Sequence, residues 1–154
     1  MIMAGTLVLG LILQFIVLAL YSVVVANQYI ATSHNLSSSA SRVLMSIGDV
    51  EPLSNEVVGR YRAMTEAERA EVDSEAYEAR FADITEREDY KNIRTTLGYF
   101  LESSDVYDIY FAMYDRETGA LVYIADPSEE DVALPGYWEK IDSREMNKFL
   151  GWNG

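Results

Sequence analysis

The first part of the chain is a long apolar run without charge. From Leu7 to Ala26, 20 residues contain a single strongly polar side chain, Gln14. A helix of this length spans about 30 Å, which is the thickness of the hydrocarbon core of a bilayer. No Lys, Arg, Asp or Glu precedes Arg42, so all 37 such residues lie in the remaining 113. The pattern predicts a transmembrane signal anchor over residues 1–27, which places the chain in a lipid bilayer.

A helical pattern continues beyond the apolar run, over residues 28–48. Its apolar and small residues are spaced four and three apart, as in the seam of a coiled coil: Tyr29, Ser33, Leu36, Ala40, Val43 and Ile47. One interpretation is a stalk that forms a homodimer together with the anchor. The other is an amphipathic helix that packs on its own domain. Gly48 and Pro52 are expected to end this helix.

The third region, residues 49–154, is predicted to form one small domain, and its first half has helical patterns. Thr65 and Glu68 match a capping box, as do Thr85 and Glu88, and Ser74 is a further N-cap candidate. The predicted helices are Asn55–Met64, short segments after Thr65 and Ser74, and an amphipathic helix over Glu86–Glu102 with Tyr90, Ile93 and Leu97 on its apolar face.

The second half of this domain has strand patterns. Val106–Tyr114 and Leu121–Ile124 are rich in β-branched and aromatic residues, and the turn between them contains Gly119. An acidic loop and a short helix over Arg144–Leu150 are expected to follow. The fold class is therefore α+β, with helices packed on an antiparallel hairpin or sheet. Because an isolated hairpin is only marginally stable, we expect further strands from a partner chain or beyond Gly154.

Composition excludes several functions. The formal net charge of −13 is unsuited to nucleic acid, which requires a basic surface. The chain has no Cys, and His34 is its single His, so it lacks the residues for Ser-His-Asp or Cys-His catalysis and for zinc or iron sites. We therefore predict that this chain is not an enzyme and contains no cofactor and no metal site.

The orientation follows from the short segment before the apolar run. We predict a single-pass protein of the cell membrane with its N-terminus cytoplasmic and residues 28–154 extracytoplasmic. The alternative is an exported protein whose signal peptide is cleaved after Val24-Val25-Ala26. The apolar run is longer than the 7–15 residues of a signal peptide and lacks a basic segment before it, which favours the anchor.

Aromatic residues with polar tips gather around the predicted hairpin. Tyr110, Tyr123, Tyr137 and Trp138 are candidate ligand-contacting residues, because such side chains combine a large apolar surface with a hydrogen-bonding group. The alternative is that they form an ordinary core. Asp126, before Pro127, is a candidate turn residue.

The hairpin also resembles a known family. Tyr107–Asp115, the turn through Gly119 and Leu121–Asp126, followed by Pro135-Gly136-Tyr137-Trp138, are similar to the N-terminal part of an extracytoplasmic Cache domain. Cache domains are PAS-like sensor modules of bacterial signalling receptors. The element order of anchor, stalk helix, amphipathic helix and hairpin agrees with this resemblance. The family's further strands, second membrane helix and output domain are not in this sequence.

The resemblance implies a function. It implies binding of a small polar metabolite such as an amino acid, amine or carboxylate, with Asp126 holding an ammonium group. Ligand binding would then move the stalk and anchor helices in a bacterial signal-transduction protein. The alternative function is that of a membrane-anchored accessory or structural protein whose domain docks a partner chain without catalysis.

Overall fold

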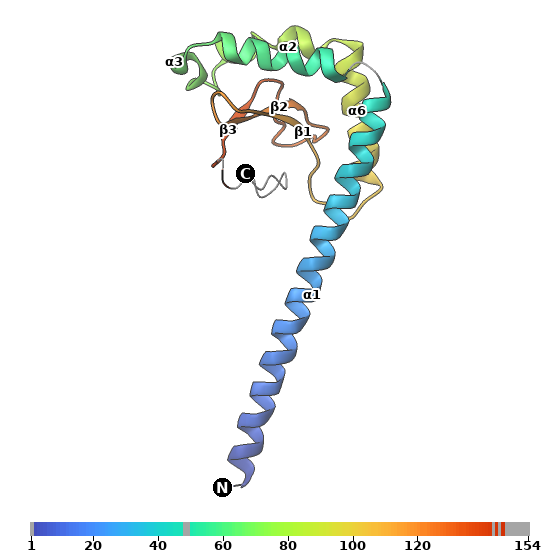
Figure 1. Cartoon of the computed structure of the whole chain (residues 1–154), viewed down its shortest axis with the longest axis vertical. Coiled ribbons are helices and arrows are strands. Elements are labelled where there is room, and N and C mark those ends of the chain that lie inside the picture. Colours follow the sequence, from blue (N-terminus) through green and yellow to red (C-terminus); the bar gives the residue numbers. More distant parts are fainter. Residues whose placement is uncertain (1, 48–49, 143, 145, 147–154) are drawn as a thin grey trace. The chain divides into compact units, whose positions relative to one another are not determined.

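The computed structural model describes residues 2–47, 50–142, 144 and 146, with side chains from Gln14 onward (Figure 1). The predicted α+β class is confirmed by a long N-terminal helix, further helices and a three-stranded antiparallel sheet. The helices are α1 (Ile2–Ile47), α2 (Val50–Ala63), α3 (Glu66–Arg69), α4 (Glu75–Glu78), α5 (Ala82–Thr85) and α6 (Glu88–Glu102); the strands are β1 (Phe111–Asp115), β2 (Ala120–Ala125) and β3 (Trp138–Lys140).

The chain divides into two compact units, Met1–Ser39 and Ala40–Gly154. The first unit contains α1 as far as Ser39, and the helix runs through the predicted boundary between anchor and stalk without interruption. Among the described residues, the part of α1 from Gln14 is the one helix long and apolar enough to cross a membrane, and its apolar window is not buried inside the protein. An N-terminal signal sequence can also satisfy these criteria of length and composition, so the helix fits either role.

The last two turns of α1 belong to the second unit and contribute to its core. Ala40 and Leu44 are buried, and Ile47 packs against the same cluster, whereas Val43 is 42% exposed. The buried spacing of four and three residues is that of an amphipathic helix packing on its own domain. For this stretch the intramolecular interpretation therefore holds, and Val43 of the predicted seam faces solvent.

Helix α2 begins five residues before the predicted Asn55, and Pro52 does not end the preceding helix. Pro52 lies in the first turn of α2. The missing N–H of a proline costs nothing there, because the first N–H groups of a helix have no intrahelical acceptor. The buried face of α2 consists of Val50, Leu53, Ser54, Val57 and Tyr61.

Two of the three predicted N-caps are confirmed. The Thr65 hydroxyl accepts a bond from the Glu68 N–H, and the Glu68 carboxylate accepts one from the Thr65 N–H at 2.7 Å. The bonds that the Glu68 carboxylate accepts from the Thr65 N–H, the Thr65 hydroxyl and Arg80 lower its pKa to about 2. Ser74 caps α4. The capping box at Thr85 is wrong, because its hydroxyl donates to the carbonyl of Ala82 and α6 begins only at Glu88.

The predicted hairpin is confirmed, and a third strand pairs with it. The sheet order is β1-β2-β3, all antiparallel. The register shifts between Phe111 and Ala112, whose partners are Ala125 and Tyr123, so β2 contains a bulge at this point. Strand β1 begins at Phe111 and not at the predicted Val106, since β2 ends at Ala125 and leaves the residues before Phe111 unpaired. Strand β3 was not predicted: this additional strand comes from residues 138–140 of the chain itself, whereas further strands were expected from a partner chain or from beyond Gly154.

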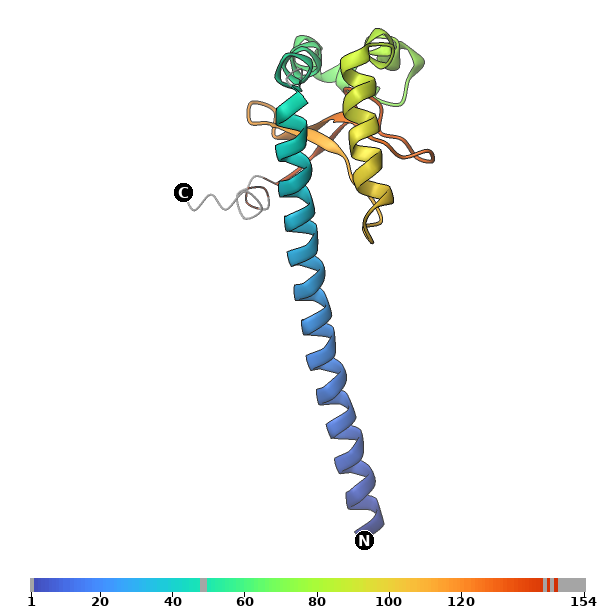
Figure 2. The same cartoon turned by 90° about the vertical axis from the view of Figure 1, so that its right-hand side faces the viewer.

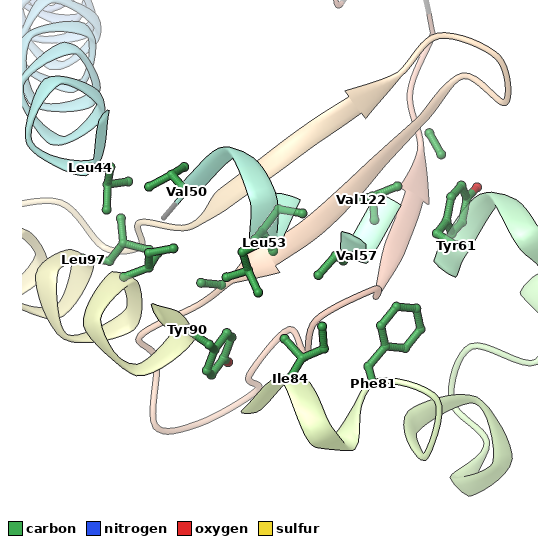
Figure 3. Close-up of a cluster of buried hydrophobic side chains, with 14 of the residues drawn as sticks. Leu44, Val50, Leu53, Val57, Tyr61, Phe81, Ile84, Tyr90, Leu97 and Val122 are labelled. Carbon is green, nitrogen blue, oxygen red and sulfur yellow. The ribbon is translucent and has the colours of Figure 1, made fainter. Parts of the chain in front are cut away.

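The core lies between the helices and one face of the sheet. Helices α2 and α6 contact each other and both contact β2, and Figure 2 shows them on the same side of the strands. The side chains between these layers are fully or almost fully buried, and most are drawn in Figure 3; they include Leu53, Val57, Ile93, Leu97, Val122 and Ile124. Tyr90, Ile93 and Leu97 of α6 face this core as predicted.

An ion pair joins the hairpin turn to α2. Arg62 donates through two nitrogens to Asp115, at 3.0 and 2.6 Å, and Thr118 donates to the other carboxylate oxygen at 2.7 Å. Burial raises the pKa of Asp115, but the bonds from Arg62, Thr118 and the Glu117 N–H outweigh it, so the net pKa is below its ordinary value. The turn is thereby fixed to α2.

Candidate functional site

Three of the predicted site residues meet on the face of the sheet that points away from the helices. The ring centroids of Tyr110 and Tyr123 are 4.8 Å apart, and those of Tyr123 and Tyr137 are 5.9 Å apart in an edge-to-face arrangement. Side chains alternate between the two faces of a strand, so Tyr123 lies opposite the buried neighbours Val122 and Ile124. We call these three residues the tyrosine face.

Hydrogen bonds fix the central residue of the tyrosine face. The hydroxyl of Tyr123 donates to Glu139 Oε1 at 2.8 Å. The backbone N–H of Tyr123 donates to the carbonyl of Tyr137, and the N–H of Gly136 donates to the carbonyl of Tyr123. Burial and the nearby Glu139 carboxylate raise the pKa of Tyr123 above its ordinary value, so this hydroxyl stays protonated at neutral pH.

Trp138 lies on the opposite face of the sheet. It is paired in register with the buried Val122. Its ring lies 5.9 Å from that of Tyr61 in α2, and its indole N–H donates to the carbonyl of Arg69 at 2.9 Å. Trp138 therefore packs on the helical layer, and the structure does not bring it together with the three tyrosines.

Asp126 stabilises the loop that follows β2. It is almost completely buried. One carboxylate oxygen accepts a bond from the Ser128 N–H at 2.8 Å, and the other accepts one from the Ala133 N–H at 2.9 Å. Arg94 of α6 donates to the carbonyls of Asp126 and Ser128. Both carboxylate oxygens are thus occupied within their own loop, as in an Asx turn.

The segment before β3 is held by a close contact with the helical layer. Gly136 has φ +83°, a conformation that favours glycine, and a Cβ at this position would overlap the ring of Phe81. The hydroxyl of Tyr77 donates to the carbonyl of Gly136 at 2.7 Å. Tyr137, the next residue, is thereby fixed beside Tyr123.

The tyrosine face offers ring surfaces and hydroxyls, and it stays partly open. Tyr110 is 42% exposed and Tyr137 is 38% exposed. Such a surface can stack on a planar or cationic group and hydrogen-bond to it. Within the described part of the chain, no group of three or more metal-ligating side chains comes together.

Sequence reasoning missed Glu139, which bonds to Tyr123. The alternation of strand residues could have found it, because alternation places Glu139 on the same face as Tyr137 and places Trp138 on the opposite face. The rule was not applied to residues 138–140, because the sequence did not predict a strand there. No family model, curated protein or solved structure matches the chain.

Proposed function

We propose that this chain is the extracytoplasmic small-molecule sensing portion of a bacterial membrane-anchored signalling protein. In this proposal α1 anchors the chain in the membrane, with the N-terminus in the cytoplasm. The domain is a partial PAS-like module of the Cache type, and its tyrosine face contacts a small polar metabolite such as an amino acid, amine or carboxylate.

One observation carries the proposal. Helix α1 contains the membrane-length apolar segment, and its last two turns supply Ala40 and Leu44 to the core of the second unit. A change in the packing of that core would therefore act on the same helix that enters the membrane. The homodimer expected through the stalk and anchor would convert such a movement into altered packing between two α1 helices.

A thermal-unfolding titration tests the sensing function. The full chain, in discs of neutral phosphatidylcholine, is mixed in turn with amino acids, amines and small carboxylates. A compound that binds the folded state should stabilise it by about 2.7 kcal/mol at 100 times its Kd. A cooperatively unfolding protein that no compound in the panel stabilises would count against sensing.

Topology is tested separately. The chain contains no Cys, so Ser103→Cys introduces the single thiol of the variant. Labelling of this thiol shows on which side of the membrane the domain lies. Ser103 is exposed at the end of α6. A membrane-impermeant maleimide should label this variant in intact cells. Labelling only after the cells are broken would place the domain in the cytoplasm.

A second candidate is a membrane-anchored accessory protein whose domain docks a partner chain. The half-exposed Tyr110 and Tyr137 on the outer face of the sheet favour it. Concentration-dependent association of the full chain, reduced by Tyr110→Ala, would support this candidate.

A further inference from the structure

Two adjoining hollows lie between α4 and the loop that precedes β3. The first has a volume of about 270 Å³, with an apolar floor of Phe81, Ala82 and Leu134 and with Glu75 and Glu78 on its wall. The second has a volume of about 120 Å³ and is lined in part by Asp73, Tyr77 and Tyr137. Both hollows share Glu78, Leu134 and Pro135, so together they form one surface, which we call the α4 groove.

The carboxylates of the α4 groove are not neutralised by the described part of the chain. Among the described residues, no ion pair and no side-chain hydrogen bond involves the carboxylates of Asp73, Glu75 and Glu78.

The arginines nearest in sequence are engaged elsewhere. Arg69 donates to the carbonyl of Met64 and lies over the Tyr61 ring, and Arg80 pairs with Glu68. Farther along the chain, Arg60 pairs with Glu56 and Asp83, and Arg87 with Glu56 and Asp89. The groove therefore keeps three negative charges beside its apolar floor. In a chain whose formal net charge is −13, this favours a cationic occupant.

Both walls of the groove are fixed without an occupant. Tyr77 of α4 is buried, donates to the carbonyl of Gly136 at 2.7 Å, and lies 5.6 Å from the Phe81 ring. Phe81 in turn packs against Gly136, where no Cβ fits. Because α4 and the loop are already joined, little ordering is required when something binds between them.

The size and openness of the hollows indicate the kind of occupant. Pockets for small molecules usually have about 300–1,000 Å³ and enclose most of the ligand. Each hollow of the α4 groove is smaller and open to solvent, and Leu134 on its floor is 38% exposed. Two shallow, adjoining hollows fit successive side chains of a polypeptide. A second copy of this chain is disfavoured, since it has the same acidic charge.

We propose that the α4 groove docks a polypeptide segment in which basic and apolar side chains alternate. A Lys or Arg of the partner lies between Glu75 and Glu78, and an apolar side chain rests on Leu134. This role is separate from ligand sensing, because the tyrosine face meets the groove only at Tyr137. The anchored domain would thereby recruit a protein of complementary charge.

The test uses a blocked tetrapeptide in which lysine and leucine alternate, added to the full chain in phosphatidylcholine discs. Methyl labelling of alanine and leucine places NMR probes on Ala79, Ala82 and Leu134 in the groove. The lysine–leucine peptide should shift these three signals saturably. A peptide of alternating glutamate and leucine should leave them unchanged. Absence of a saturable shift with the lysine–leucine peptide would overturn the proposal.

Matched variants separate docking from general attraction to an acidic protein. Glu75→Gln with Glu78→Gln removes two charges from the groove and should weaken binding about fivefold. Glu102→Gln with Asp105→Asn removes two charges at exposed positions at the end of α6, outside the lining of the groove, and should leave the affinity unchanged. Equal weakening by both pairs would mean that only net charge attracts the peptide, and would contradict a specific groove.

A small amine is the competing occupant. Phenethylamine, titrated against the same three methyl signals, should displace the tetrapeptide only weakly or not at all. If phenethylamine saturates the groove and the tetrapeptide does not, the occupant is a small molecule and the docking proposal is wrong. The tyrosine face, which shares Tyr137 with the groove, keeps its own thermal-unfolding test.

Discussion

The two faces of the sheet come from alternating residues of the same strands, yet they differ in chemistry. Val122 and Ile124 of β2 are completely buried beneath α2 and α6. Tyr123, between them, lies on the other face with the half-exposed Tyr110 and Tyr137. The inner face is aliphatic and closed, which stabilises the fold, whereas the outer face keeps hydroxyls within reach of water. The inner face therefore stabilises the domain, and the outer face is the one that remains accessible.

The largest effect is expected where the inner layer meets the segment before β3. Gly136→Ala forces a side chain into a positive φ and into the Phe81 ring, and should cost about 4 kcal/mol of unfolding free energy. Gly59→Ala is the control, because its Cβ would meet no atom within 4 Å inside α2, and it should stabilise the protein by about 0.5–1 kcal/mol. Equal stability of the two variants in chemical denaturation would contradict the contact.

The second prediction compares one residue from each face. Ile124→Ala removes a fully buried side chain and should destabilise the protein by about 3 kcal/mol. Tyr110→Ala removes a half-exposed ring whose described aromatic contact is with Tyr123, and should cost about 1 kcal/mol. Urea unfolding of both variants measures the difference. A larger loss for Tyr110→Ala would mean that the outer face is also a core.

The third prediction concerns the ion pair between the hairpin turn and α2. Asp115→Asn should cost about 2 kcal/mol at pH 7, because it removes a buried charge-assisted bond to Arg62. The pKa of Asp115 is lowered in the folded state, so its stabilisation is complete above the ordinary value of about 4 and is lost as the pH falls through the folded value.

The stability difference between wild type and Asp115→Asn should therefore shrink between pH 5 and the acid limit of folding. Unfolding free energies measured from pH 7 downward test this. A difference that stays constant over the whole range would show that the charge of Asp115 contributes nothing.

The smallest effect belongs to the outer face. Tyr123→Phe deletes the bond to Glu139 and should cost about 1 kcal/mol at pH 7. The pKa of Tyr123 is raised in the folded state, so its contribution is fully present below pH 10 and is lost as the pH rises further. Above pH 10 the variant should lose stability less steeply than wild type. Tyr107→Phe, at a position 96% exposed, should match wild type at pH 7.

Local features of the fold were predictable from the sequence. The capping box at Thr65, the buried face of α6 and the hairpin depend on contacts between near neighbours, and all three are confirmed. Strand β3 and the early start of α2 depend on contacts with distant segments. Trp138 at the start of β3, for example, donates to the Arg69 carbonyl and packs against the Tyr61 ring. No local sequence pattern predicts these two contacts.

The candidate site was predictable in part for the same reason. Strand alternation, a rule that the sequence alone supplies, places Tyr123 on the face opposite Val122 and Ile124, and Tyr110, just before β1, meets it there. The same rule separates the adjacent Tyr137 and Trp138, once 138–140 is known to be a strand. The α4 groove was not predictable, since its floor joins Phe81 to Leu134 across a long stretch of sequence.

The central claim is that the tyrosine face contacts a ligand. The most direct measurement is the thermal stabilisation by the best compound of the metabolite panel, compared between wild type and Tyr110→Ala with Tyr137→Ala. The control pair, Tyr99→Ala with Tyr107→Ala, removes two exposed tyrosines outside the face. We expect the stabilisation to disappear in the first pair and to persist in the second. Full stabilisation of the first pair, or none in wild type, would contradict the claim.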